Sequence, residues 1–173
     1  MHLKKGRKKE KMLKEKDRKR RKSVVKTIFF LIFFVSCTQT PEYKKVHTFK
    51  NKIWEQEKEI DYTFKIKDTI KKHDITLFLR TTTDYKYNNL WVLLTTETPE
   101  GKKTEPEPIE IKIAHPDGVW IGKKTGSIVE TNIYFKNRVF PQKGEYKIKL
   151  KQATTKEEVG QVLDLGLFIQ KKS

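Results

Sequence analysis

The sequence predicts an all-β fold, an antiparallel β-sandwich of about eight strands that lies behind a cleaved amino-terminal leader. Two observations predict the sandwich: apolar residues recur with a period of two along several runs, and Pro-Gly turns separate these runs. A third observation predicts the leader, because a basic block and a short apolar run precede the chain's one cysteine.

The leader is expected to be a lipoprotein signal peptide that spans residues 1–36. Its apolar run, residues 28–35, is followed by the small residue Ser36 and then by Cys37. This order resembles a bacterial lipobox, in which the cysteine thiol receives a diacylglycerol and signal peptidase cuts just before it. We therefore expect Cys37 to carry the lipid and to anchor the protein to a membrane.

The length of the apolar run decides against the main alternative, an ordinary thiol beside a transmembrane helix. A membrane span needs about 20 apolar residues, whereas the core of a signal peptide needs about 7 to 15. The leader is long for a signal peptide, and Met12 is an alternative start that would give an ordinary length.

Most of the net positive charge belongs to the leader, +11 of the total +17. The chain has 39 Lys and Arg against 22 Asp and Glu, a formal charge of +17, and residues 1–26 alone hold 14 basic and 3 acidic side chains. A run such as residues 16–22 could bind nucleic acid, but positive charge before an apolar segment is typical of export signals. We expect no nucleic-acid partner.

The predicted mature chain consists of a short tether, residues 37–45, and one domain, residues 46–173. The tether is polar, contains Pro41 and lacks periodicity. The domain is long enough to bury a core of its own. Since Cys37 is the only cysteine, no internal disulfide is expected, and stability must come from packing.

Five period-two runs are the clearest predicted strands, each with one apolar and one mostly wet face. They are residues 60–67, 75–80, 109–113, 146–151 and 163–170. A further predicted strand, residues 90–94, is apolar on both faces and is expected in the middle of a sheet. Turns are expected at residues 99–101, 116–118 and 141–144, where Pro and Gly occur together. No convincing amphipathic helix follows Cys37.

The residues offer no catalytic or metal-binding constellation. His47, His73 and His115 lack ligand spacing, and a turn explains His115 and Asp117 better than a metal does. Ser127 has no strand-to-helix elbow and no histidine placed to activate it. We expect no metal, no cofactor and no enzymatic activity.

Recognition is instead expected on a loop, because sandwich strands are committed to the core. The segment 116–127 holds three glycines around one large ring, a composition typical of recognition loops. The candidate residues are Asp117, Gly118, Trp120, Gly122 and Gly126. In the competing interpretation, Trp120 plugs the open end of the sandwich and the glycines only allow the turn.

Several segments, in this order and behind a lipobox cysteine, resemble the gliding-motility lipoprotein GldH family of the Bacteroidetes. They are His115–Gly122 continuing through Ile128, Tyr87–Trp91, Phe140–Tyr146 and Val162–Leu167. The resemblance covers roughly residues 37 to 171. It implies an outer-membrane lipoprotein that is needed for gliding and is associated with type IX secretion, and it implies no catalytic residue.

Two functions compete. The first is a non-enzymatic interaction lipoprotein whose partners are other gliding or secretion proteins and, through Cys37, the membrane. The second is a carbohydrate-binding cell-surface lipoprotein. An exposed row among the aromatic residues of the domain would favour it, and the candidates are Trp54, Trp91, Trp120, Tyr85 and Tyr87. Surface-exported lipoproteins of this phylum carry several acidic residues soon after the cysteine. Here only Glu42 is close, which favours the periplasmic leaflet of the outer membrane.

Overall fold

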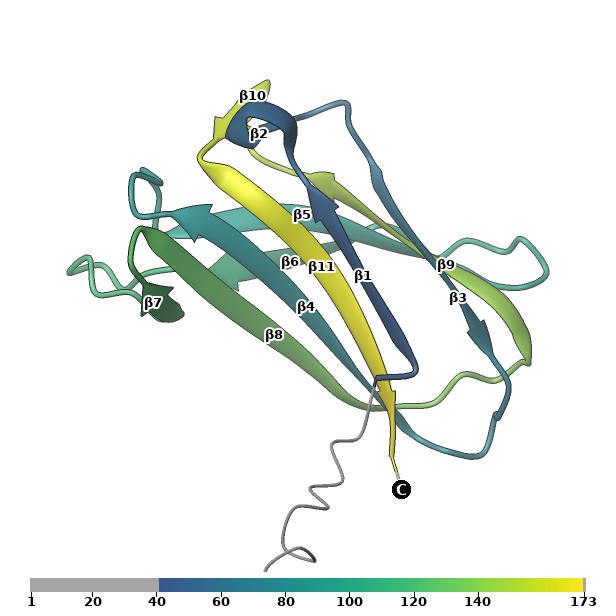
Figure 1. Ribbon diagram of the computed structural model, residues 1–173. Coiled ribbons are helices and arrows are strands. Elements are labelled where there is room, and N and C mark those ends of the chain that lie inside the picture. The colour runs from purple at the N-terminus through teal and green to yellow at the C-terminus, as the bar shows by residue number, and fades with distance from the viewer. Residues whose placement is uncertain (1–40, 173) are drawn as a thin grey trace, which may run out of the picture. The chain divides into compact units, whose positions relative to one another are not determined.

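The computed structural model describes residues 41–172, and these residues fold as β-strands joined by turns (Figure 1). Eight strands have six or more residues: β1 (Tyr43–Thr48), β3 (Ile60–Ile66), β4 (His73–Thr82), β5 (Asn89–Glu97), β6 (Glu107–Lys112), β8 (Ile128–Arg138), β9 (Gly144–Gln152) and β11 (Val162–Lys171). Three strands are shorter: β2 (Ile53–Glu55), β7 (Lys123–Thr125) and β10 (Glu158–Gly160). One 3-10 turn, η1 (Lys50–Lys52), interrupts the chain after β1.

The strands form two main antiparallel sheets. The five-stranded sheet has the order β1-β11-β4-β8-β7, and the four-stranded sheet has the order β3-β9-β5-β6. A small third sheet pairs β10 with β2. The two main sheets face each other as layers (Figure 1), which confirms the predicted antiparallel sandwich.

The core lies between the sheets and comes from the period-two faces. Along β3, Ile60, Tyr62, Phe64 and Ile66 are buried, and Asp61 and Lys65, which alternate with them, are exposed. Alternate residues of β9 pair with this face, with Tyr62 opposite Ile148 and Ile60 opposite Leu150. A half-buried strand has this period because successive side chains point to opposite faces.

Strand β11 departs from the predicted alternation at its start. A bulge between Val162 and Asp164 shifts the register against β4, so Val162 is buried in the core while Leu163 is only half-buried. The prediction that placed Leu163 on the same apolar face as Leu165 was therefore wrong. A bulge adds one unpaired residue to a strand and reverses the facing of the residues before it.

The amino-terminal boundary of the sandwich also differs from the prediction. Strand β1 begins at Tyr43 and pairs with β11 from Tyr43 opposite Ile169. The domain therefore starts before the boundary expected at residue 46, and the last residues of the predicted tether belong to the sheet. Because Lys44 and Lys45 are charged, the pattern of apolar residues does not reveal this edge strand.

The outer face of the five-stranded sheet carries an aromatic pair. The rings of Phe78 and Phe168 stack with their centroids 4.9 Å apart. Phe78 is buried although it points away from the core, because its ring lies directly over Gly166 of the neighbouring strand. The Arg80 guanidinium lies 6.0 Å from the Phe78 ring, and the Lys44 ammonium lies 5.0 Å from the Phe168 ring.

The loops gather at two opposite ends of the sandwich. One end, called the anchor-side end because the predicted lipid site precedes it in the sequence, holds the start of β1, the β3–β4 loop and the end of β11, since Tyr43 pairs with Ile169 and Lys171 pairs with His73. The β5–β6 and β8–β9 loops lie at the same end, where the Gln142 side chain hydrogen-bonds to Glu100. The distal end holds the β4–β5 loop, the β6–β7 loop and the short strand β7 (Figure 1). The ten residues of β4 separate the two ends by roughly 30 Å at about 3.3 Å per residue.

Candidate functional site

Of the two predicted sites, only the recognition loop lies within the described residues. Cys37, the predicted lipid-attachment residue, lies outside them. The loop lies at the distal end, between β6 and β8, and includes the edge strand β7.

The tip of this loop is a tight, internally hydrogen-bonded turn. The Gly118 N–H donates to the His115 carbonyl at 2.9 Å, and the His115 N–H donates to the Val119 carbonyl at 2.8 Å. The Asp117 carboxylate accepts the Val119 N–H at 3.0 Å. Asp117 thus has a local role, since an aspartate that binds a backbone N–H two residues ahead stabilises a turn.

Each of the three glycines has its own structural reason. Gly118 has φ of +85° and Gly126 has φ of +60°, values that glycine adopts without steric cost. Gly122 packs against β8, where an added Cβ would lie 2.3 Å from the Glu130 carbonyl oxygen and 2.7 Å from the Thr131 hydroxyl. The glycines therefore fix the shape of the loop.

Trp120 is not the side chain that this loop exposes most. It is half-buried against the hydrophobic core and bridges to Ala114 through the backbone. Its neighbours Val119 and Ile121 point outward and are 58% and 44% exposed. Sequence reasoning chose the largest ring and missed these two residues, although their alternation with Trp120 is the signal that would have found them.

A second feature at the distal end is a hollow of about 270 Å³ with an aromatic wall. Its lining comes from the β4–β5 loop, β5, the β9–β10 loop and β10. The lining residues are Tyr85, Tyr87, Asn89, Trp91, Ala153, Thr154, Thr155, Lys156 and Val159. Tyr87 is 47% exposed and Trp91 is 41% exposed, so two rings are open to solvent at this place.

The wall of the hollow is held firmly. The Tyr85 ring packs edge-on against Tyr87 at 5.6 Å, and the Tyr85 hydroxyl donates to the Asn89 carbonyl at 3.0 Å. Burial, and next the neighbouring Tyr87, raise the pKa of the Tyr85 hydroxyl well above its usual range, so this group stays a neutral donor. Opposite the rings, the Ala153 N–H donates to the Trp91 carbonyl at 2.8 Å.

The two features are connected. The N–H groups of Ile113 and Ala114, which precede the turn, both donate to the Asn88 carbonyl at 2.8 and 3.0 Å. The Thr83 N–H donates to the Ser127 carbonyl at 2.9 Å and joins the β4–β5 loop to the β7–β8 turn. The loop and the hollow therefore form one ordered surface.

Metal chemistry and a membrane-spanning helix find no support within the described residues. No three side chains of His, Cys, Asp or Glu gather between residues 41 and 172 in a way that could hold a metal ion. Over the same residues, the structure contains no helix with the length and apolarity to cross a membrane.

The fold and this surface define a class of protein, namely a β-sandwich domain that presents a rigid apolar loop and a shallow aromatic hollow at one end. Within this class, the chain belongs to the GldH lipoprotein family, whose match covers residues 42–169. This confirms the family expected from the sequence. The family description names a lipoprotein and no enzymatic activity.

Two relatives extend over nearly the whole chain. A gliding motility lipoprotein GldH homolog from Christiangramia forsetii is 28% identical over 160 residues, which cover 86% of this chain and 95% of the relative. The gliding motility lipoprotein GldH of Flavobacterium johnsoniae is 30% identical over 151 residues, which cover 82% of this chain and 91% of the relative.

Solved structures are less similar. A family GH115 glucuronidase aligns with 80% of this chain and 18% of its own at a TM-score of 0.44 and 8% identity. A similarity of this size carries no conclusion about function.

Proposed function

We propose that this protein is a lipid-anchored outer-membrane lipoprotein that acts as a non-enzymatic component of the gliding-motility and type IX secretion apparatus. The observation that carries the proposal is the family match over residues 42–169 directly behind the lipobox-like Phe34–Cys37 order. The Flavobacterium johnsoniae relative is named for gliding motility, which supports the assignment of the process.

The anchor belongs to Cys37 in this proposal. Two or three acyl chains on one residue hold a protein on a membrane far more firmly than a single chain, which binds only marginally. Only Glu42 is acidic near the cysteine, which supports the periplasmic leaflet of the outer membrane as the location.

The working surface belongs to the distal end. Val119 and Ile121 are apolar, exposed and held on a turn that its own hydrogen bonds order. A rigid apolar protrusion loses little conformational freedom when a partner covers it, and the burial of apolar surface is the main favourable term in most protein–protein association. The partner in this proposal is another protein of the gliding or secretion apparatus.

Gene replacement tests the proposal in a gliding host. We expect deletion of the gene to abolish spreading on agar and export of surface adhesins, and the wild-type chain to restore both. The Cys37→Ala variant should restore neither. Normal spreading and export in the deletion strain would contradict the proposal.

A second candidate function is carbohydrate binding in the aromatic hollow. The observation that favours it is the exposure of Tyr87 and Trp91 beside the polar groups of Asn89, Thr154 and Lys156. Flat rings with a polar rim suit the faces and hydroxyls of a sugar.

Titration of cell-surface and peptidoglycan fragments tests this second candidate, with Trp91 fluorescence as the readout. Saturable quenching that Trp91→Ala removes would support it. No change in fluorescence with any fragment would reject it.

A further inference from the structure

The anchor-side end of the sandwich carries almost all of the net positive charge of the chain that follows the leader. Its segments 41–42, 67–74, 98–106, 136–143 and 171–172 hold ten basic and five acidic side chains, a net charge of +5. The rest of residues 27–173 holds 15 basic and 14 acidic side chains. The basic excess of the domain is therefore concentrated at one end.

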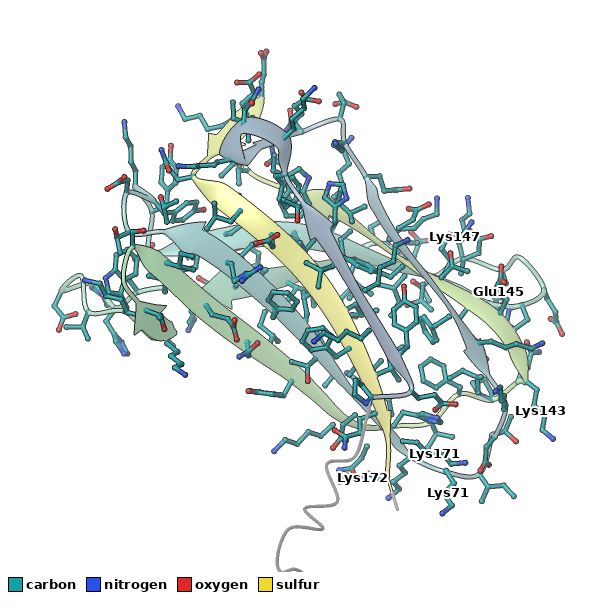
Figure 2. All side chains as sticks on the ribbon, in the orientation of Figure 1. Lys71, Lys143, Glu145, Lys147, Lys171 and Lys172 are labelled. Carbon is teal, nitrogen blue, oxygen red and sulfur yellow. The ribbon has the colours of Figure 1, made fainter. Side chains whose placement is uncertain are left out.

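The cations at this end that are exposed and make no ion pair within residues 41–172 include Lys67, Lys71, Lys72, Lys136, Arg138 and Lys143. Figure 2 shows Lys71 close to Lys171 and Lys172 at this end, with Lys143 on the same side of the molecule. Exposed, unpaired lysines that share one surface attract anions.

The β3–β4 loop at the centre of this end also presents an apolar side chain. Ile70 is 89% exposed, the highest value among the exposed large hydrophobic residues of the described chain. Lys71 and Lys72 follow it directly. An apolar tip next to lysines is the composition of segments that insert into the headgroup region of a membrane.

The loop is ordered by one carboxylate. Asp68 accepts the N–H groups of Ile70 at 3.0 Å and Lys71 at 3.3 Å, and its other oxygen lies 2.9 Å from the Lys171 ammonium. The hydrogen bond from Lys171, and next those from the two backbone N–H groups, hold the pKa of Asp68 below its usual range. The carboxylate is therefore charged at neutral pH and keeps Ile70 pointing outward.

The chain enters the domain at this same end. The Glu42 carboxylate lies 3.4 Å from the buried His73 imidazole at the start of β4, which fixes the place where the chain enters β1. Three residues lie between Cys37 and Pro41, which makes four Cα-to-Cα steps; an extended chain spans at most about 3.6 Å per step, or roughly 14 Å in all. A lipid on Cys37 therefore keeps this end within a few Debye lengths of the headgroups.

From the short tether, the charge and the exposed isoleucine together, we infer that the anchor-side end docks on the leaflet that holds the lipid. Lys71 and Lys72 contact anionic phospholipid headgroups, and Ile70 enters the interface between them. This inference rests on the proposed lipidation of Cys37. Its consequence is that the domain stands upright, with the loop and the hollow of the distal end turned away from the membrane.

The test uses the full, lipidated protein reconstituted into vesicles. The Cys37 sulfur is occupied by lipid in the proposal, so Ile70→Cys creates the one free thiol of the chain for an environment-sensitive fluorophore. We expect blue-shifted emission on vesicles that contain phosphatidylglycerol and water-like emission on phosphatidylcholine vesicles. A label at Lys156→Cys, on the β9–β10 loop, should report water on both.

Charge reversal then tests the lysines. In the Ile70→Cys background, Lys71→Glu with Lys72→Glu should abolish the blue shift, because each lysine near an anionic surface changes the docked population about fivefold. The matched control is Lys123→Glu with Lys124→Glu, an adjacent exposed pair on β7 at the distal end, which should leave the shift unchanged.

Three results would overturn the inference: water-like emission from position 70 on both vesicle types, an equal shift on both, or an equal loss from the control pair. A different result would show that Cys37 carries no lipid. A wild-type chain with a free thiol at Cys37 would contradict the proposed lipidation, whatever the label at position 70 reports.

Discussion

Gly166→Ala should destabilise the domain although it adds one methyl group on the outer face of a sheet. A Cβ at this position would lie 1.7 Å from Cε1 of Phe78 and 2.5 Å from Cδ1 and Cζ, where an ordinary contact needs 3.4 Å or more. The Phe78 ring is 5% exposed and stacked on Phe168, so it cannot move aside without losing that contact.

The magnitude follows from two costs. Overpacking of this kind costs about 1 to 3 kcal/mol, and the loss of an aromatic stack costs about 0.5 to 1.5 kcal/mol. We expect the free energy of unfolding to fall by about 3 kcal/mol, which for a domain of this size lowers Tm by about 10 °C. Urea titration followed by tryptophan fluorescence measures the change, because Trp54 is fully buried.

A double-mutant cycle identifies the cause. In a Phe78→Ala background the added methyl meets no ring, so Gly166→Ala should cost less than about 0.5 kcal/mol there. Gly160→Ala is the control, because that glycine has no atom within 4 Å of an added Cβ. An equal cost of Gly166→Ala in both backgrounds would refute the argument from close packing.

Three further outcomes are expected. Trp120→Ala should lower the free energy of unfolding by about 2 to 3 kcal/mol, because the ring is half-buried on the core. Val119→Ser with Ile121→Ser should keep the free energy of unfolding within about 0.5 kcal/mol of wild type but abolish pull-down of the partner. The reverse pattern would show that Trp120 is the recognition residue. Asp68→Ala should speed hydrogen exchange at the Ile70 and Lys71 amides, and unchanged exchange would show that Asp68 does not order the loop. Because the pKa of Asp68 is lower in the folded than in the unfolded chain, the protection of these amides in the wild type should be constant above about pH 5 and decline only in stronger acid. The domain should unfold in one cooperative transition that a chelator leaves unchanged, as packing alone holds it, and a lower Tm with chelator would reveal a metal.

The sequence predicted the fold well where one face of a strand is apolar and the other polar. Ile60 to Ile66 and Tyr146 to Leu150 are such runs, and both are strands with the expected residues inside. The period of two is a direct consequence of strand geometry, so it survives in any sheet with one wet face.

The prediction failed where tertiary contacts override this pattern. Strand β8 was not singled out, because Thr131 takes an inward position between Val129 and Ile133 and interrupts the apolar face. The bulge in β11 depends on the register against β4, which no local pattern contains. By its position in the alternating pattern, Phe78 is expected on the solvent-facing side of the strand. Its burial is explained only by Gly166 on the neighbouring strand, which leaves room for the ring.

The segment 116–127, predicted as a recognition loop, is a loop between strands in the structure, but its most exposed apolar residues are Val119 and Ile121 and not Trp120. A sequence shows that residues 119–121 are apolar, and the hydrogen bonds of the turn decide which of them points outward. The aromatic hollow combines residues 85–91 with residues 153–159, which are distant in sequence. Such a site is visible only once β5 and β9 are known to pair.

The proposed location, the docking of the anchor-side end and the orientation of the distal end all depend on the lipid on Cys37. Mass spectrometry of the amino-terminal peptide, from protein purified from its native membranes, detects this lipid. We expect a peptide that begins at Cys37 and carries a diacylglycerol thioether on its sulfur. A peptide that retains residues before Cys37, or that begins there with an unmodified thiol, would show that the anchor is absent.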